Sequence, residues 1–207
     1  MGTRFSYLFI SFVCAFTTIS CQKEIDGSVA GIIVPGDQNP KIGTIWTYRY
    51  YTYYSYGPLQ TAKTLYYKAK SEEVLGGEKW LRIVDMETDT TVIYLSKKPD
   101  GLYQYANNSS NLLCKYPAAI NDNYTTFNEG ATEDFIVKGV NDTIATGIGN
   151  VPINYYEGFK TAKLIDLIWY NKNAWILWKT QYRYIVVPGV GARYYLYSKM
   201  FIDNIVY

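Results

Sequence analysis

Polar and apolar residues alternate at a period of two along most of this chain. The alternation is clear from Ile45 to Tyr56, where it places Trp46 on one side of an extended segment. Turn signals such as residues 75–78 (LGGE) and 98–101 (KPDG) separate this run from later ones. Residues 159–170 also fit a short helix, but no segment of ten or more residues has a convincing 3.6 period. The pattern predicts a mainly β protein.

Strands that follow one another through tight turns predict an antiparallel meander. We expect about ten to twelve strands, and a sheet of that many must curl or close rather than stay flat. Residues 118–131 are polar and irregular and are predicted as a loop. Three short strands are predicted after it, at 135–140, 143–148 and 151–156. The expected fold is a half-barrel or partly open barrel with an aromatic concave face.

The first twenty residues have the pattern of an export signal. Arg4 supplies one positive charge, and the run from Phe5 to Ile19 is uncharged and largely apolar. At about fifteen residues, this run is shorter than the ~20 that a membrane-crossing helix needs. Its end, Ser20-Cys21, resembles the lipobox of bacterial lipoproteins. The resemblance implies cleavage before Cys21 and attachment of acyl chains such as palmitate to it; a chance cysteine in the signal of a released protein is the alternative.

Further stretches of the chain carry a more specific resemblance. Residues 21–26 (CQKEID) are similar to the start of many Bacteroidetes lipoproteins, which implies the outer membrane and its cell-surface face, with the periplasmic leaflet as the alternative. Tyr116-Pro117 and the segment from Tyr184 to the turn at 188–191 (PGVG) resemble lipoproteins of that group, which look like half-barrel lipoprotein carriers. The implied domains are a signal peptide (1–20), a flexible tether (21–42) and one β domain (43–207).

Charge and residue usage exclude several classes of function. Without residues 1–20 the chain has 19 basic and 18 acidic residues, the lysines are scattered, and we expect no binding to nucleic acid. The chain has no histidine, which excludes Ser-His-Asp and Cys-His catalysis and His-ligated zinc. Cys114 is then a small buried hydrophobe. We expect no catalytic residue, no metal and no cofactor. A carboxylate-dependent glycan hydrolase is the alternative, with candidates Asp85, Glu87, Glu133, Asp134 and Asp166.

Tyrosine is the compositional outlier, with 23 residues in the chain. Rings with polar rims suit half-hydrated strands and can stack on sugars or line an apolar groove. The candidate ligand-binding residues are Trp46, Tyr48, Tyr50, Tyr51, Tyr53, Trp169, Trp175 and Trp178. Ordinary cross-strand packing is the alternative explanation for them. The sequence therefore predicts a membrane-anchored, non-catalytic domain that binds a glycan, a lipid or a partner; a structural envelope lipoprotein is a further alternative.

Overall fold

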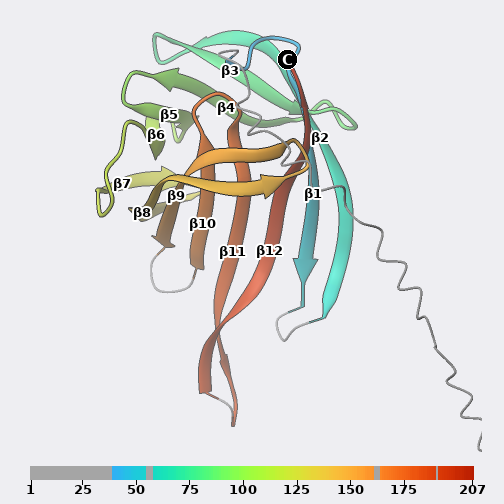
Figure 1. The fold of residues 1–207 in the computed structure, drawn as a ribbon, viewed down its shortest axis with the longest axis vertical. Coiled ribbons are helices and arrows are strands. Elements are labelled where there is room, and N and C mark those ends of the chain that lie inside the picture. The colour runs from blue at the N-terminus through green and yellow to red at the C-terminus, as the bar shows by residue number, and fades with distance from the viewer. Residues whose placement is uncertain (1–38, 55–57, 161–163, 190) are drawn as a thin grey trace, which may run out of the picture.

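A computed structural model describes residues 39–54, 58–160, 164–189 and 191–207, which form twelve strands and no helix (Figure 1). The strands are β1 (Ile45–Tyr53), β2 (Leu59–Leu75), β3 (Glu78–Asp85), β4 (Thr91–Lys98), β5 (Gly101–Ala106), β6 (Ser109–Lys115), β7 (Asn123–Asn128), β8 (Ala131–Thr146), β9 (Gly149–Lys160), β10 (Leu164–Asn171), β11 (Trp175–Val187) and β12 (Gly191–Val206). Within those ranges there is no helix of the length and apolarity needed to cross a membrane.

All twelve strands belong to one antiparallel sheet in the order β6-β5-β4-β3-β2-β1-β12-β11-β10-β9-β8-β7. Neighbours in sequence are neighbours in space, and the first strand pairs with the last, from Ile45 opposite Val206 to Thr52 opposite Ser198. The sheet curls until it is nearly a closed barrel with one unsealed seam, between β6 and β7. The predicted antiparallel meander, curled into a partly open barrel, is confirmed.

No backbone hydrogen-bond ladder joins the described residues of β6 and β7, and side chains bridge the seam between these strands instead. The Tyr124 hydroxyl donates to the Leu113 carbonyl at 2.8 Å, and the Gln104 amide donates to the Phe127 carbonyl at 2.7 Å. An edge strand has backbone carbonyl groups without a partner strand, and a side-chain donor supplies the hydrogen bond that such a carbonyl would otherwise lack. The seam is therefore held by individual hydrogen bonds.

Two predictions about the middle of the chain are wrong. Residues 118–131, predicted as a loop, contain β7, which pairs with the start of β8. The three strands predicted between 135 and 156 are two, because β8 continues past Asn141 to Thr146 with shifts of register near Gly139. In β7 the buried positions are polar, as at Asn128, so the apolar alternation is interrupted. In β8 the exposed pair Asn141-Asp142, with a positive φ at Asn141, has the sequence of a turn although the strand continues through it.

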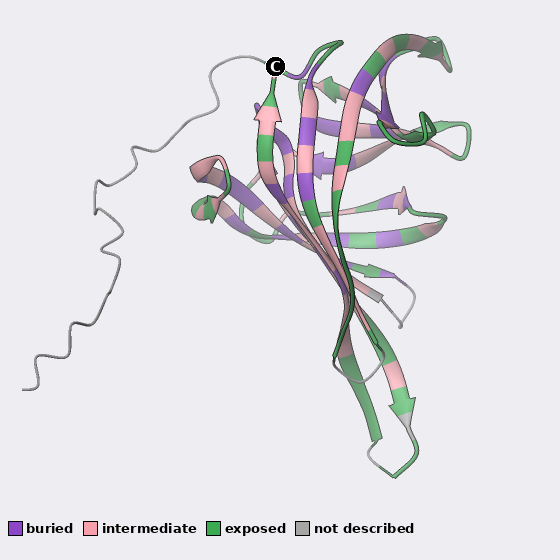
Figure 2. Cartoon of the chain, turned by 90° about the vertical axis from the view of Figure 1, so that its right-hand side faces the viewer, coloured by how far each residue is buried: buried purple, intermediate pink, exposed green. Residues whose placement is uncertain are grey.

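The up-and-down order gives the barrel two different ends. The β1–β2, β3–β4, β5–β6, β7–β8, β9–β10 and β11–β12 turns lie at one end, here called the hairpin end. At the other end Trp46 and Trp175 stack with ring centroids 5.8 Å apart, and Trp46 Nε1 donates to the Ala174 carbonyl at 3.2 Å. Both indoles are almost wholly buried, so this second end is closed. Figure 2 shows the contrast between buried strand segments there and exposed ones on the projecting β11–β12 hairpin.

The predicted signal peptide, Cys21 and the tether as far as residue 38 lie outside the described residues. Two of residues 39–42, the last of the predicted tether, contact the barrel, whereas Lys41 and Ile42 are exposed. Pro40 is buried, and Lys97 Nζ donates to Asn39 Oδ1 at 2.6 Å. Cys114 is buried and free, as the sequence predicts for a small hydrophobe.

Candidate functional site

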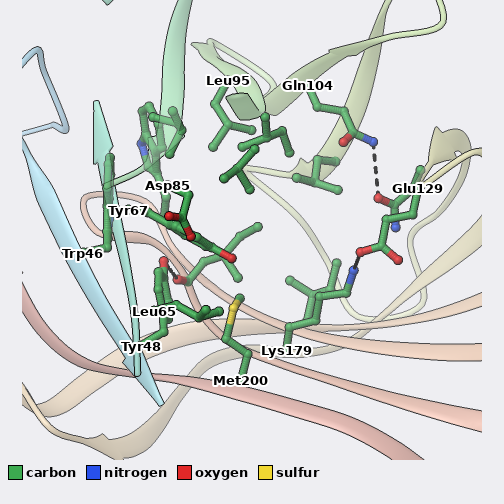
Figure 3. A pocket seen from close by; sticks show the side chains of 18 of the residues that line it. Trp46, Tyr48, Leu65, Tyr67, Asp85, Leu95, Gln104, Glu129, Lys179 and Met200 are labelled. Carbon is green, nitrogen blue, oxygen red and sulfur yellow. Dashed lines mark hydrogen bonds and ion pairs between the residues drawn. The ribbon is translucent and has the colours of Figure 1, made fainter. Parts of the chain in front are cut away.

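The barrel encloses a cavity of about 700 Å³ (Figure 3). Most of its wall is apolar, and these residues come from seven strands and the start of β11: Trp46, Leu65, Ile83, Ile93, Leu95, Leu113, Ile168, Trp175, Ile176 and Met200. The residues that line it toward the closed end are buried, whereas Lys63 and Thr91, toward the hairpin end, are exposed. The cavity therefore runs from the core toward the hairpin end.

β1 directs an aromatic row into the cavity because its alternate residues face inward. Trp46, Tyr48 and Tyr50 all line the wall. The Tyr48 hydroxyl donates to the Ile176 carbonyl at 2.9 Å, and its ring lies 5.7 Å from that of Tyr67. Burial, with the nearby Tyr67, raises the pKa of Tyr48, and burial together with Asp85 raises the pKa of Tyr67 to about 12. Both phenols stay neutral donors at physiological pH.

The opposite wall is polar, and it is drawn on the right of Figure 3. Lys179 forms an ion pair with Glu129, and Gln181 Nε2 donates to Glu129 Oε2 at 2.7 Å. Ser198 Oγ donates to Gln181 Oε1 at 2.9 Å, which fixes the orientation of that amide. Burial acts to raise the pKa of Glu129, but Lys179 and then Lys160 outweigh it and hold this pKa at about 2. The cation on this wall is therefore already neutralised by a carboxylate.

A second layer of charge lies behind that wall. Glu133 and Asp166 have no exposed surface and do not line the cavity. Lys160 Nζ lies 2.9 Å from Asp166 Oδ2 and 3.6 Å from Glu133 Oε2, and Asn128 Nδ2 donates to Glu133 Oε2 at 2.6 Å. Burial, reinforced by Asp166, raises the pKa of Glu133 to about 7. Three carboxyl groups and two lysines thus form one network inside the barrel, here called the charge cluster (Glu129, Glu133, Lys160, Asp166, Lys179).

The structure separates the predicted aromatic candidates into two groups. Trp46, Tyr48, Tyr50 and Trp175 line the cavity. Tyr51, Trp169 and Trp178 do not; they belong to an outward-facing aromatic ladder, defined as Tyr155, Trp169, Trp178, Phe201 and Tyr51. Tyr53 does not line the cavity either and pairs with Leu59 beside the β1–β2 turn.

Successive rings of the ladder lie against one another across five strands. Tyr155 stacks on Trp169 at 4.9 Å, and Tyr51 stacks on Phe201 at 5.8 Å. Lys199 Nζ lies 4.7 Å from the Trp178 ring centroid. Two of the four ring contacts are stacked and two are tilted, which is the arrangement that cross-strand packing of neighbouring aromatic residues produces.

Sequence reasoning missed the polar wall. Gln104, Lys179 and Gln181 read as ordinary polar positions in strands. The sequence did contain a signal for Lys179 and Gln181. Successive side chains of a strand point to opposite faces, so an outward-facing Trp178 on β11 places Lys179 and Gln181 on the inward face. Their partners on β10 and at the β7–β8 turn become known only from the three-dimensional register.

Comparison of the chain with protein-family models, curated proteins and solved structures finds no match. What defines the protein is therefore its own geometry: a nearly closed antiparallel barrel with an internal cavity that is apolar on most of its wall and polar on one side.

Proposed function

We propose that this protein is a lipid-anchored lipoprotein of the bacterial outer membrane, displayed at the cell surface, whose barrel binds an amphipathic lipid without acting on it chemically. The observation that carries the proposal is the cavity of about 700 Å³ with an apolar wall and one polar side. That volume lies within the roughly 300–1,000 Å³ typical of small-molecule sites. The resemblance to Bacteroidetes lipoproteins supplies the anchor and the location.

The chemistry of the wall favours an acyl chain with an uncharged head. Each methylene transferred from water to an apolar wall contributes about 0.8 kcal/mol, so a long chain binds here without any specific contact. On the polar side the side-chain oxygens of Gln104, Asn128, Gln181 and Ser198 can accept hydrogen bonds from a head group, because their N–H and O–H groups already donate within the protein. Lys179 is already paired with Glu129, so an anionic head gains no free cation. Hydroxyl or amide head groups fit this surface best.

Two alternatives find less support in the geometry. A hydrolase needs two carboxyl groups facing one substrate, but Glu133 and Asp166 lie behind the wall. The wall carboxylates, Asp85 on β3 and Glu129 at the β7–β8 turn, come from different sides of the barrel. A glycan needs a free ring face for stacking, and the rings of the aromatic ladder stack on one another. The binding of a lipid in the cavity requires neither arrangement.

Titration with a fluorescent acyl amphiphile tests cavity binding. Met200→Trp adds bulk inside the cavity, and Met86→Trp makes the same change in the exposed β3–β4 turn as a matched control. We expect Met200→Trp to weaken binding at least about tenfold, because the indole occupies the volume of the acyl chain, and Met86→Trp to bind as the parent does. Absence of binding by the parent, or equal affinity of both variants, contradicts the proposal.

Metabolic labelling with palmitate tests the anchor separately. Cys21→Ser is expected to abolish labelling and to release the protein into the soluble fraction. Cys14→Ser, a change inside the apolar run, is the matched control and keeps the label. A labelled Cys21→Ser protein, or an unlabelled parent, rules out the anchor without bearing on the cavity.

A further inference from the structure

The β11–β12 hairpin projects beyond the barrel wall (Figures 1 and 2). The described pairing of β11 with β10 stops at Arg183, and the pairing of β12 with β1 stops at Ser198. From Tyr184 opposite Tyr194 to Val187 opposite Gly191, the two strands pair only with each other. The β1–β2 hairpin lies beside it and points the same way. The tip surface is defined by described residues on the outer parts of these two hairpins: Tyr54, Leu59, Arg183, Tyr184, Val186, Arg193 and Tyr194.

The tip surface exposes large apolar side chains. Val186 is 68% exposed, and the rings of Tyr184 and Tyr194, 5.1 Å apart, are also exposed. On the neighbouring hairpin, Tyr54 and Leu59 are each more than half exposed. Tyrosines beside aliphatic groups are the side chains that concentrate where a protein enters the head-group region of a bilayer.

The outer parts of these hairpins carry basic residues and no carboxylate, because Glu72, Glu73 and Asp203 lie toward the other ends of β2 and β12. The sequence has no Asp or Glu between Asp166 and Asp203, or between Asp37 and Glu72. Arg193 is exposed on the projecting part of β12. Arg183 is exposed at the residue of β11 where the projection begins, with its guanidinium carbon 3.9 Å from the Tyr197 ring centroid. The acidic β3–β4 turn lies well away, because Asp85 pairs with Tyr67, about 25 Å along β2 from its start at Leu59. The tip surface is therefore locally cationic although the chain as a whole is nearly neutral.

We propose that the tip surface docks onto a bilayer that carries anionic head groups. Val186 and the tyrosines enter the interface, and Arg183 and Arg193 contact the lipid phosphates. Apolar side chains alone fit a protein partner equally well, but the complete absence of carboxylates selects an anionic surface. Docking uses residues outside the cavity wall, so it stands independently of the ligand proposed above. It also turns the hairpin end of the cavity toward the membrane.

Co-sedimentation with vesicles tests this inference. The assay uses residues 22–207, which contain all twelve strands but neither the apolar run of residues 5–19 nor Cys21. Vesicles contain phosphatidylcholine alone or an equal mixture with phosphatidylglycerol. We expect binding to the mixture that weakens as salt is raised, and little binding to phosphatidylcholine.

Two matched pairs of variants locate the contact. Val186→Asp is compared with Val74→Asp, because both valines are 68% exposed but Val74 lies at the closed end. We expect Val186→Asp to lose at least about tenfold in partitioning and Val74→Asp to behave as the parent.

The second pair compares two double variants. One carries Arg183→Gln and Arg193→Gln, and the other carries Lys79→Gln and Lys172→Gln, which change two exposed lysines at the closed end. About fivefold is expected per arginine, hence about 25-fold for the first variant, and no change for the second. Equal losses within either pair, binding indifferent to phosphatidylglycerol, or no binding by the parent overturns the inference. The vesicle assay contains no monomeric amphiphile, so its failure is distinguishable from a failure of cavity binding.

Discussion

Glu133 makes the stability of this barrel depend on pH in an unusual direction. Its carboxyl is fully buried, and burial with the neighbouring Asp166 raises its pKa from 4.5 to about 7. Between these values the unfolded chain has released the proton while the folded chain still holds it. The folded state then binds more protons, so the free energy of unfolding falls as pH rises. The contribution of Glu133 to the free energy of unfolding is fully present below pH 4.5 and is lost as the pH rises through 7.

The magnitude follows from the width of that window. One pKa unit corresponds to 1.36 kcal/mol, so the loss between about pH 4.5 and pH 7.5 is about 3 kcal/mol. The chain has no histidine, so no imidazole titrates in the same window. Glu129 shifts the other way, with a pKa held at about 2, and its contribution changes only below pH 4.5. The slope between pH 5 and 7 therefore reports on Glu133.

Glu133→Gln keeps the shape of the side chain and removes the ionisation. An amide leaves one polar group without a second partner, which costs about 1 kcal/mol. The variant is then less stable than the parent by about 1 kcal/mol near pH 4.5 and more stable by about 2 kcal/mol near pH 8. The two stability curves cross near pH 5.5.

Urea unfolding followed by tryptophan fluorescence, repeated from pH 4.5 to 8, measures both curves. Glu72→Gln, which changes an exposed carboxylate on β2, is the control and keeps the slope of the parent. A parent whose stability is flat or rises between pH 5 and 7, or a Glu133→Gln protein that retains the slope, would falsify the assignment of a buried, neutral Glu133.

Three further outcomes follow from single contacts. Tyr124→Phe removes the hydroxyl that donates to the Leu113 carbonyl across the seam, so we expect a loss of about 1 kcal/mol in unfolding free energy and faster amide exchange in β6 and β7, measured by mass spectrometry. Gly158→Ala places a methyl against the ring of Phe135 and the buried carboxyl of Glu133, so thermal unfolding should show a loss of at least about 2 kcal/mol. Burial raises the pKa of the Cys114 thiol, so it should stay unreactive to a disulfide reagent in the native state and react fully in urea; native-state reactivity would contradict its burial.

The fold was largely predictable because most of its strands signal themselves locally. Where one face is apolar and the other hydrated, as in β1 and β3, the period of two marks the strand and its inward side. β7 gives no such signal, since its buried positions are Thr126 and Asn128. Asn128 is polar because it donates to Glu133 of the charge cluster and accepts from Gln104 across the seam, so the local pattern fails where the interior holds hydrogen-bonded polar groups.

The candidate site was half predictable for the same reason. Alternation on β1 identifies Trp46, Tyr48 and Tyr50 as one row, and the structure directs that row into the cavity. The charge cluster depends instead on which strands are neighbours. Asp166 meets Gln181 because β10 and β11 pair in that register, and nothing in either segment alone specifies it.

The polar wall and the closure of the barrel are one structure. Gln104 on β5 lies across the seam from β7, where it donates to Phe127 and to Asn128 Oδ1 at 3.4 Å. Asn128 in turn holds Glu133, and Glu129 at the next position pairs with Lys179 on β11. The groups that would hold a lipid head therefore also tie the edge strand β7 to the rest of the sheet. Opening the seam must disturb the polar side of the cavity, so the lipid binding proposed above predicts that ligand release and separation of β6 from β7 are energetically coupled.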